Sequence, residues 1–304
     1  MANLFKFFII TILLITFIFP CLANTKRLYC STCNKSIRRN RTYVVDSEKN
    51  PYCNQRCFRK TLPACSLCQR QAPKMLKAHD GQIFCIPCSK LARCSSCQKP
   101  GAKIQLPDDR KLCTSCYTNG INDINTIRKY FNHVREELKV KLGLFTPNLI
   151  HLKVVDKREL DQKSGQPGQP VSGCYHYEYK TQTTIKKNRL GKVVDKKTKI
   201  VNKKHTIYVL SHLPVDKLKT VLAHELTHDW HHYYYPKLKD LTDSEGAAQY
   251  ITWIYCKLNN LPNLAKEIEL NKHPVYATGF KRVKSHAQNS KLTGLRSYLD
   301  QKYR

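Results

Sequence analysis

The stretch Ala223-His224-Glu225-Leu226-Thr227-His228 places the pattern His-Glu-x-x-His inside an apolar run. Two histidines four residues apart lie on the same face of an α-helix, one turn from each other. Both imidazoles can therefore reach a single tetrahedral zinc ion. Glu225 points to a different azimuth, from which it can take a proton from a zinc-bound water. The pattern predicts zinc-dependent hydrolysis of peptide bonds.

The flanking residues favour this interpretation over a surface helix with two solvated histidines. Pro214 suits the first turn of a helix, and Leu218, Leu222 and Leu226 follow with helical spacing. Upstream, residues 206–210 are rich in β-branched and aromatic side chains and predict a strand. The free edge of such a strand can bind an extended substrate beside the metal.

A catalytic zinc site needs a third protein ligand and an open position for water. We expect Glu245, at the start of a second helical run over residues 242–257, to be that ligand. The alternative role for Glu245 is in a Thr-x-x-Glu capping box that begins at Thr242. The neighbouring Gly246 allows close approach of another backbone, which suits a metal site better than a plain helix interior. Less favoured ligands are Asp243 and two histidines that we interpret as covering the helix end, His231 and His232.

The expected mechanism assigns Glu225 as the general base, which accepts the water proton and passes it to the leaving amine. The developing oxyanion needs a donor besides the zinc. Tyr276 and His273 are candidates for that donor by composition, and the alternative for Tyr276 is a packed aromatic.

Cysteines carry the second signal. The chain has 15, and 12 of them form six close pairs with the spacing C-x₂-C…C-x₂₋₃-C, three times over. Each unit can supply four thiolates to one structural zinc ion. Such units are too small to fold on apolar burial alone, so zinc supplies folding energy. An apolar residue precedes the third cysteine of each unit (Tyr52, Phe84, Leu112). The three units are Cys30, Cys33, Cys53 and Cys57; Cys65, Cys68, Cys85 and Cys88; and Cys94, Cys97, Cys113 and Cys116.

The N-terminus has the pattern of a signal peptide over residues 1–23. Lys6 precedes a 13-residue apolar run, and a small-residue cleavage site ends at Ala23. We therefore expect an exported protein, secreted or periplasmic, without a transmembrane span after signal removal. Export would permit disulfides in place of zinc, but paired cysteines at ribbon spacing favour zinc. Lipid anchoring at Cys21 is disfavoured beside Pro20. The spacing leaves two other cysteines open, as buried thiols or a disulfide: Cys174 and Cys256.

Length and charge set the outer bounds. The 304 residues allow about two domains, which we place at residues 24–118 for the ribbons and 119–304 for the peptidase region. A net charge of +31 predicts acidic or anionic partners. The densest basic segment, residues 186–204, is interpreted as a solvated β-hairpin. Nucleic-acid binding is not favoured, because the ribbons lack a regular basic and aromatic face.

The remaining pattern predicts an α+β fold with a small antiparallel sheet and the His-Glu-x-x-His helix packed across it. We expect a helix over 123–142, a strand over 150–155, a loop over 161–173, and an antiparallel meander of strands 174–185, 192–201 and 206–211. Further helices are expected near 263–270 and over 279–301.

The chain resembles the plant LIM-domain peptidases of the DA-one type from its last ribbon to its C-terminus. The shared motifs are Cys94-Ser-Ser-Cys97, Leu106-Pro-Asp-Asp-Arg-Lys-Leu-Cys113, Leu222-Ala-His-Glu-Leu-Thr-His-Asp-Trp230, Glu245-Gly-Ala-Ala-Gln249 and Pro274-Val-Tyr-Ala-Thr-Gly-Phe-Lys281.

This resemblance implies LIM-like ribbons followed by a zincin-like, gluzincin-type metalloendopeptidase domain. It implies that His224, His228 and Glu245 bind zinc and that Glu225 is the base, and it points to Tyr276 as a further site residue. One catalytic and about three structural zinc ions follow from ligand counting, with ribbons that act in docking or regulation and with protein or peptide substrates. The first two ribbons match LIM spacing loosely, and the family's ubiquitin-linked substrates do not carry over. The alternative function is a non-catalytic zinc-ribbon binding protein with a vestigial peptidase fold.

Overall fold

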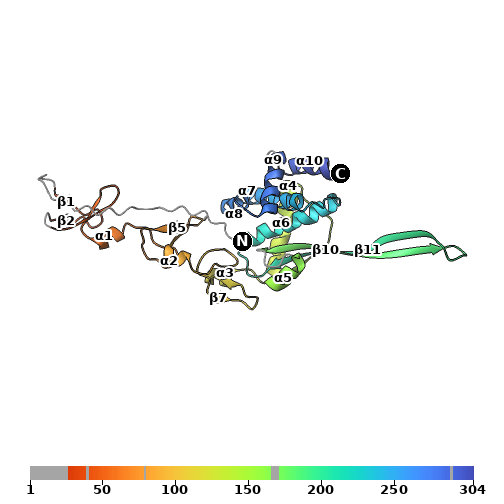
Figure 1. Ribbon diagram of the computed structural model, residues 1–304, viewed down its shortest axis with the longest axis horizontal. Coiled ribbons are helices and arrows are strands. Elements are labelled where there is room, and N and C mark those ends of the chain that lie inside the picture. The colour runs from red at the N-terminus through yellow and green to blue at the C-terminus, as the bar shows by residue number, and fades with distance from the viewer. Residues whose placement is uncertain (1–26, 39–40, 79, 166–170, 288–289) are drawn as a thin grey trace. The chain divides into compact units, whose positions relative to one another are not determined.

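The computed structural model describes residues 27–38, 41–78, 80–165, 171–287 and 290–304 (Figure 1). The predicted signal peptide and Cys21 lie outside the described residues. No helix within these described ranges combines the length and apolar character that crossing a bilayer requires. The chain divides into two compact units: Met1–Cys94 with Gln98–Lys103, and Ser95–Cys97 with Ile104–Arg304.

The cysteine units share one plan: short antiparallel strand pairs followed by a helix of one or two turns. The apolar residues before the third cysteine, Tyr52, Phe84 and Leu112, are all buried, and cysteines form much of the core in the first two units. The first unit comprises β1 (Leu28–Tyr29), β2 (Ser36–Ile37), β3 (Val44–Val45), β4 (Pro51–Tyr52) and α1 (Gln55–Arg59). The second comprises β5 (Met75–Lys77), β6 (Ile83–Cys85) and α2 (Ile86–Ser89), and the third β7 (Ile104–Gln105), β8 (Lys111–Leu112) and α3 (Thr114–Asn119).

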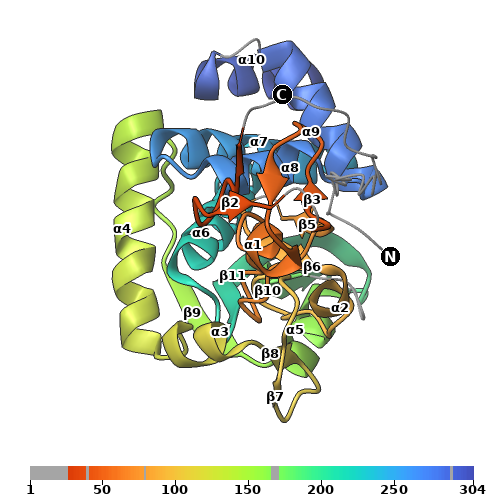
Figure 2. The same ribbon diagram turned by 90° about the vertical axis from the view of Figure 1, so that its left-hand side faces the viewer.

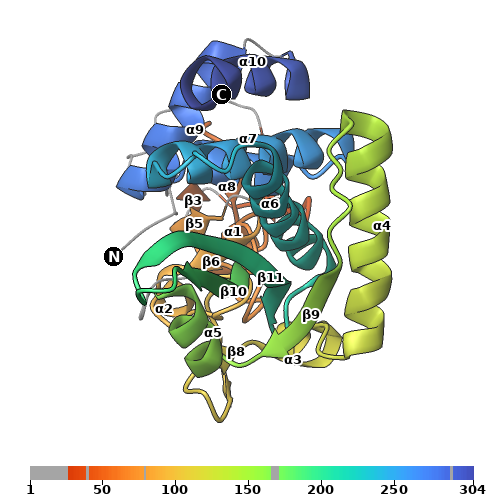
Figure 3. The same ribbon diagram turned by 90° about the vertical axis from the view of Figure 1, so that its right-hand side faces the viewer.

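The C-terminal unit contains a three-stranded sheet in the order β10-β11-β9 (Figure 3). β10 (Gly173–Lys187) runs antiparallel to β11 (Val193–Leu210), and β11 runs parallel to β9 (Ile150–Val155). The predicted three-stranded meander is therefore wrong, because residues 192–201 and 206–211 belong to one continuous strand. The predicted hairpin is confirmed. The strand over 206–210 is central, and the edge strand beside it is β10.

Helices α4 (Ile124–Leu142) and α6 (Val215–Tyr234) pack together, and α6 lies between the sheet and α7 (Leu241–Leu258) in Figure 3. The predicted apolar stripe of α4 is confirmed: Ile127, Phe131, Val134 and Leu138 are all buried. Pro214 precedes the first turn of α6 as its N-cap. These elements share one large apolar core, in which α6 is buried along most of its length.

The later helices depart from the predicted boundaries. Instead of one helix over 279–301, α9 (Pro274–Ala287) and α10 (Lys291–Tyr303) are separate, and Lys291 has a φ of 51° that interrupts the helical path. α8 (Pro262–Glu269) agrees with the prediction. α7 lies between α6 and the pair formed by α9 and α10 (Figures 2 and 3).

A helix also begins before the predicted loop over 161–173. α5 (Lys157–Ser164) is capped by Asp156, whose side chain accepts the Glu159 N–H, and it ends at Gly165 with a φ of 64°. The Asp-x-x-Glu spacing was the signal for this helix, and the loop prediction is wrong over its first residues.

Candidate metal centres

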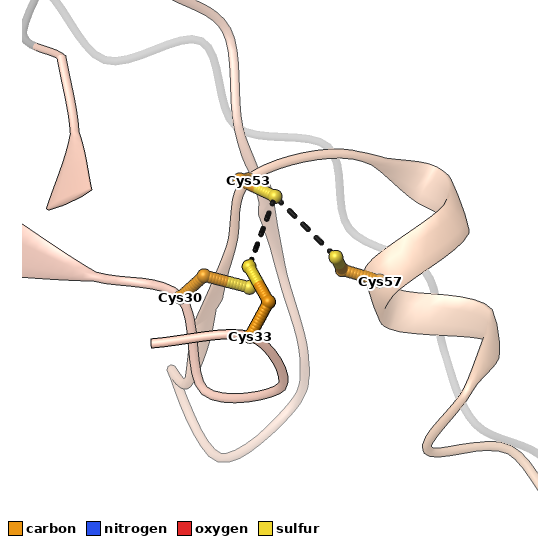
Figure 4. A group of neighbouring side chains, drawn as sticks. All are labelled: Cys30, Cys33, Cys53 and Cys57. Carbon is orange, nitrogen blue, oxygen red and sulfur yellow. Dashed lines mark hydrogen bonds between the residues drawn. The ribbon is translucent and has the colours of Figure 1, made fainter. Parts of the chain in front are cut away.

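The twelve ribbon cysteines gather into the three predicted groups of four. Within each group the sulfur atoms lie within 4.8 Å of one another. Figure 4 shows the first group, in which Cys33 and Cys53 sulfurs are 3.7 Å apart and Cys53 and Cys57 sulfurs 3.4 Å apart. A disulfide needs about 2.05 Å, whereas tetrahedral zinc with bonds of about 2.3 Å separates its sulfur ligands by about 3.8 Å. The spacing therefore fits zinc and not disulfides.

The first cysteine pair of each group sits in the same backbone turn. The first cysteine's N–H donates to a carbonyl five residues on (Lys35, Arg70, Lys99), and its carbonyl accepts an N–H four residues on. That fourth residue has a positive φ in every case: 55° at Asn34, 60° at Gln69 and 61° at Gln98. The repetition means that three separate sequences fold into one knuckle. In the first two ribbons this knuckle brings backbone N–H groups to the sulfur of the first cysteine.

In each of the first two ribbons, local electrostatics favour thiolate at the first cysteine. Burial acts to raise the pKa of Cys30, but N–H donors of Cys53, Cys33 and Thr32 outweigh it and lower that pKa to about 6. The same balance, with N–H donors from the second ribbon, lowers the pKa of Cys65 to about 6. Contact with Cys57 and burial raise the pKa of Cys53 to about 12, and burial and contact with Cys85 raise that of Cys88 to about 12. Each group thus holds one thiolate, the form that binds zinc, next to thiols that a dication would have to deprotonate.

The fourth candidate centre is built on α6 and α7. His224 Nε2 lies 3.1 Å from Glu245 Oε2 and 3.1 Å from His228 Nε2, and His228 Nε2 lies 3.5 Å from the same oxygen. Zinc bonds of about 2.0–2.1 Å to nitrogen and oxygen separate tetrahedral ligands by about 3.4 Å. The three side chains are mostly buried but retain exposed fractions of 11–15%. The predicted His₂Glu set thus converges.

Glu245 does not serve as a capping residue. The N-cap of α7 is Asp240, whose side chain accepts the Asp243 N–H, so the predicted capping box at Thr242 is wrong. Burial acts to raise the pKa of Glu245, but His228 and His224 outweigh it and hold that pKa well below its usual range. Glu245 is therefore a carboxylate, the form that a dication requires.

His231 contacts the ring nitrogen of His228 that faces away from Glu245. Its Nε2 lies 2.8 Å from His228 Nδ1 and 3.1 Å from Ser244 Oγ, and the side chain is buried. The interpretation of His231 as a cover for the helix end is therefore wrong. A partner on the second ring nitrogen fixes the orientation of a metal-binding imidazole. The spacing of three residues after His228 was the available signal.

Glu225 lies against the edge strand β10. Its Oε2 accepts the Tyr175 N–H at 2.7 Å, and the side chain is buried. Burial raises the pKa of Glu225, and the charge of Glu245 adds to this. Together they outweigh the two imidazoles, which act to lower that pKa. A Cβ at Gly173 would lie 2.4 Å from Val221 and 3.0 Å from the Glu225 carboxylate, so glycine lets the strand approach. Sequence reasoning missed both β10 residues, since nothing local links them to Glu225.

Tyr276 approaches the site from the first turn of α9. Its ring centroid is 6.4 Å from that of His224 and 5.0 Å from that of His273. The approach depends on a crossing of α7 and α9, where a Cβ on Gly246 would meet the Gly279 backbone at 2.4 Å. The close approach predicted at Gly246 is therefore confirmed, with α9 as the neighbour. Burial and the charges of Glu245 and Glu225 raise the pKa of Tyr276, so its hydroxyl stays protonated and can donate.

Asp243 anchors the C-terminal helices to α7 and is fully buried. Its carboxylate accepts four hydrogen bonds from α9 and α10 and has no place among the three converging ligands. The donors are Arg282 at 2.7 Å, Tyr298 at 2.8 Å, Lys302 at 2.8 Å and Tyr303 at 2.6 Å.

Two parts of the third ribbon, Ser95–Cys97 and the residues from Ile104 on, belong to the C-terminal unit and contact the segment just before α6. Ser96 Oγ donates to the His212 carbonyl at 3.0 Å, and Arg110 donates to Ser211 at 2.9 and 2.8 Å. Asp108 accepts the Lys157 N–H at 2.8 Å. This ribbon is therefore tied to the segment that leads into the His-Glu-x-x-His helix.

Cys174 and Cys256, the two cysteines outside the ribbons that the structure describes, are free thiols, which settles the choice left open by their spacing. Burial raises the pKa of Cys174 and of Cys256 to about 12. Both are therefore protonated and unreactive at neutral pH.

Comparison with known proteins finds two similar plant proteins, one of which is named for its LIM domain. The chain is 25% identical over 267 residues to the LIM domain-containing protein HDR3 of rice, covering 78% of this chain and 52% of that protein. It is 26% identical over 229 residues to Protein DA1-related 2 of Arabidopsis thaliana, covering 66% of this chain and 43% of that protein. The chain thus spans about half the length of the curated relatives it matches. No protein-family profile and no solved structure matches it. The chain is thus a distant relative of DA1-type LIM proteins, with three four-cysteine sites that suggest LIM-like ribbons and about three structural zinc ions.

Proposed function

We propose that the chain is a zinc metallopeptidase of zincin-like fold, with His224, His228 and Glu245 as ligands of a catalytic zinc. The observation that carries the proposal is the convergence of these three side chains at 3.1–3.5 Å beside a buried Glu225. A zinc ion there would act as a Lewis acid and lower the pKa of a water molecule toward ~7.

Glu225 is the proton carrier of this mechanism. Burial raises its pKa, which moves the carboxyl toward the range in which it can both accept a proton from water and return it to the leaving nitrogen. The Tyr175 N–H at 2.7 Å fixes one carboxylate oxygen and leaves the other for water. Tyr276, protonated and next to His224, is the donor proposed for the oxyanion.

The edge strand β10 supplies the place for the substrate backbone. It is the outermost strand of the described sheet and reaches Glu225 at Tyr175. An extended peptide can add to such an edge and present successive peptide groups to the site. In this proposal the ribbons dock or regulate protein substrates.

Replacement of Glu225 by Gln tests the proposal because it keeps the side-chain volume and removes the base. We expect hydrolysis of fluorescein-labelled casein and of a mixed fluorogenic peptide library to fall at least ~100-fold. Bound zinc should stay unchanged. Glu136→Gln, an exposed change on α4 with 62% side-chain exposure, is the matched control. Equal cleavage by wild type and Glu225→Gln, or a zinc-loaded wild type that leaves both probes intact, would contradict the proposal.

We also propose that residues 1–23 are a cleaved export signal. N-terminal sequencing of the protein recovered from its native compartment should begin at Asn24. A chain that retains Met1 would contradict this part of the proposal.

A further inference from the structure

The hairpin formed by β10 and β11 extends far beyond the sheet as an arm, defined here as residues 178–204 (Figure 1). The ladder between its strands is continuous from Gly173↔Val209 to Lys187↔Val193, with two bulges. β9 pairs only as far as His205, so the arm has no third strand among the described residues. An isolated two-stranded hairpin is only marginally stable in water. The side chains on the surface of the arm therefore indicate the kind of partner that it binds.

The arm is strongly basic. It contains ten Lys and Arg residues and two acidic residues, which leaves a net charge of +8. One of the two acids, Asp195, already lies 3.6 Å from Lys197. The arm therefore presents a concentrated positive field to an anionic partner.

The arm also exposes aliphatic side chains, which charge alone does not explain. Of the 21 large hydrophobic side chains exposed within the described ranges, seven lie in these 27 residues. Four of them surround the distal turn, and no aromatic residue occurs over 180–204. The exposed fractions are 84% at Leu190, 62% at Val194, 56% at Val193 and 50% at Ile185.

The distal turn satisfies its own backbone. Asn188 Oδ1 accepts the N–H groups of Leu190 at 3.1 Å and Lys192 at 2.9 Å. The Gly191 N–H donates to the Asn188 carbonyl at 3.0 Å. A turn whose N–H groups are bonded internally can leave water at low cost.

We propose that the arm docks on a bilayer surface rich in anionic phospholipid, with the turn at Leu190 entering the interface. Aliphatic side chains at the tip would bury among acyl chains, and the flanking lysines would lie at headgroup level. Single-stranded nucleic acid fits less well, since it is held by aromatic stacking and no aromatic residue occurs over 180–204. A DNA duplex, into which a basic hairpin can insert an aliphatic wedge, is the competing partner that the test must distinguish. This inference is independent of the proposed peptidase activity.

Vesicle sedimentation tests the proposal on the chain from residue 24, because the apolar segment over residues 7–19 would itself bind lipid. The removed residues lie outside the described structure. We expect binding to vesicles of phosphatidylcholine with phosphatidylserine, and at least tenfold weaker binding to phosphatidylcholine alone.

Two variants separate the charge from the apolar tip. Charge is removed by Lys186→Gln, Lys187→Gln, Arg189→Gln and Lys192→Gln together, with four exposed lysines elsewhere as the matched control set: Lys129, Lys237, Lys239 and Lys266. Apolar surface is removed by Leu190→Ser, Val193→Ser and Val194→Ser, matched by Val140→Ser and Leu149→Ser, which are 72% and 78% exposed outside the arm. Both arm variants should weaken vesicle binding about tenfold or more, and both control sets should not.

Insertion has its own readout. Tryptophan fluorescence of Leu190→Trp should be quenched by brominated acyl chains, and that of Leu149→Trp should not. The proposal is overturned if the arm variants bind vesicles like wild type or if Leu190→Trp is not quenched. Arm-dependent binding to DNA or to a polyglutamate peptide, without vesicle binding, would also overturn it.

Discussion

The cysteine ribbons and the histidine–glutamate centre present candidate metal ligands from opposite kinds of scaffold. In the second ribbon the core consists of Cys65, Met75, Ala78, Phe84, Cys85 and Cys88, so half of its residues are ligands themselves. The side chains of His224, His228 and Glu245 instead project from two long helices whose other faces fill a core of more than thirty residues. Because cysteines make up so much of the ribbon core, we expect the ribbons to depend on metal to fold, whereas apolar packing alone should form the helical centre.

Removal of one candidate ligand from each scaffold should reveal the largest difference between them, because only the ribbon should unfold. Zinc contributes about 10 kcal/mol or more to folding of a small structural site, which exceeds what six buried residues can supply. Cys65→Ser should therefore abolish amide-exchange protection across residues 65–88. His224→Ala should leave protection in α6 and α7 near wild type. Melting of these helices in His224→Ala, or a second ribbon that stays protected in Cys65→Ser, would refute the contrast.

Asp243→Asn should show how strongly the buried Asp243 carboxylate ties α9 and α10 to α7. The buried carboxylate accepts hydrogen bonds from Arg282, Tyr298, Lys302 and Tyr303. Loss of its charge should lower the free energy of unfolding of the C-terminal unit by about 2–3 kcal/mol, measured by urea denaturation. The matched control is Asp240→Asn, which keeps a good N-cap. Equal stability of the two variants would contradict this account.

Asp108→Asn should have a smaller effect, about 1–2 kcal/mol at neutral pH. Burial acts to raise the pKa of Asp108, but the Lys157 N–H and Arg110 outweigh it and lower that pKa. A lowered pKa stabilises the fold above the ordinary Asp pKa of about 3.9, and this contribution is lost as the pH falls through the folded-state value. The stability difference from wild type should therefore be constant at pH 5–7 and shrink below about pH 4.

Asp109→Asn is the control for that pH series. The Asp109 side chain is 81% exposed and pairs with an exposed Arg158, so its loss should change stability little. An Asp108→Asn difference that is absent at pH 7, or that grows on acidification, would show that the third ribbon is not tied to the C-terminal unit in this way.

Sequence patterns correctly predicted the cysteine groups and the helices α4 and α6, whose geometry depends on residues close together in the chain. Cysteine spacing predicted three sulfur groups, and helical periodicity predicted α4 and α6, because one repeated geometry decides each of them. The Asp-x-x-Glu spacing of α5 was also local and was overlooked.

Tertiary contacts explain the rest. Gly173 and Tyr175 meet Glu225 only after β10 becomes the edge of the sheet, and the length of β11 is decided by its pairing with β10. His231 follows His228 by one turn, yet only the depth of α6 in the core decides that it is buried. Whether Glu245 caps α7 or faces the two histidines likewise depends on the position of Asp240 and on the approach of α6.

Bound zinc per chain, measured by elemental analysis of wild type and of His228→Ala, tests the central claim most directly. Ligand counting predicts about four zinc ions in wild type and about three in the variant, with the ribbon amides equally protected in both. About three zinc ions in both proteins would contradict a catalytic metal at His224, His228 and Glu245.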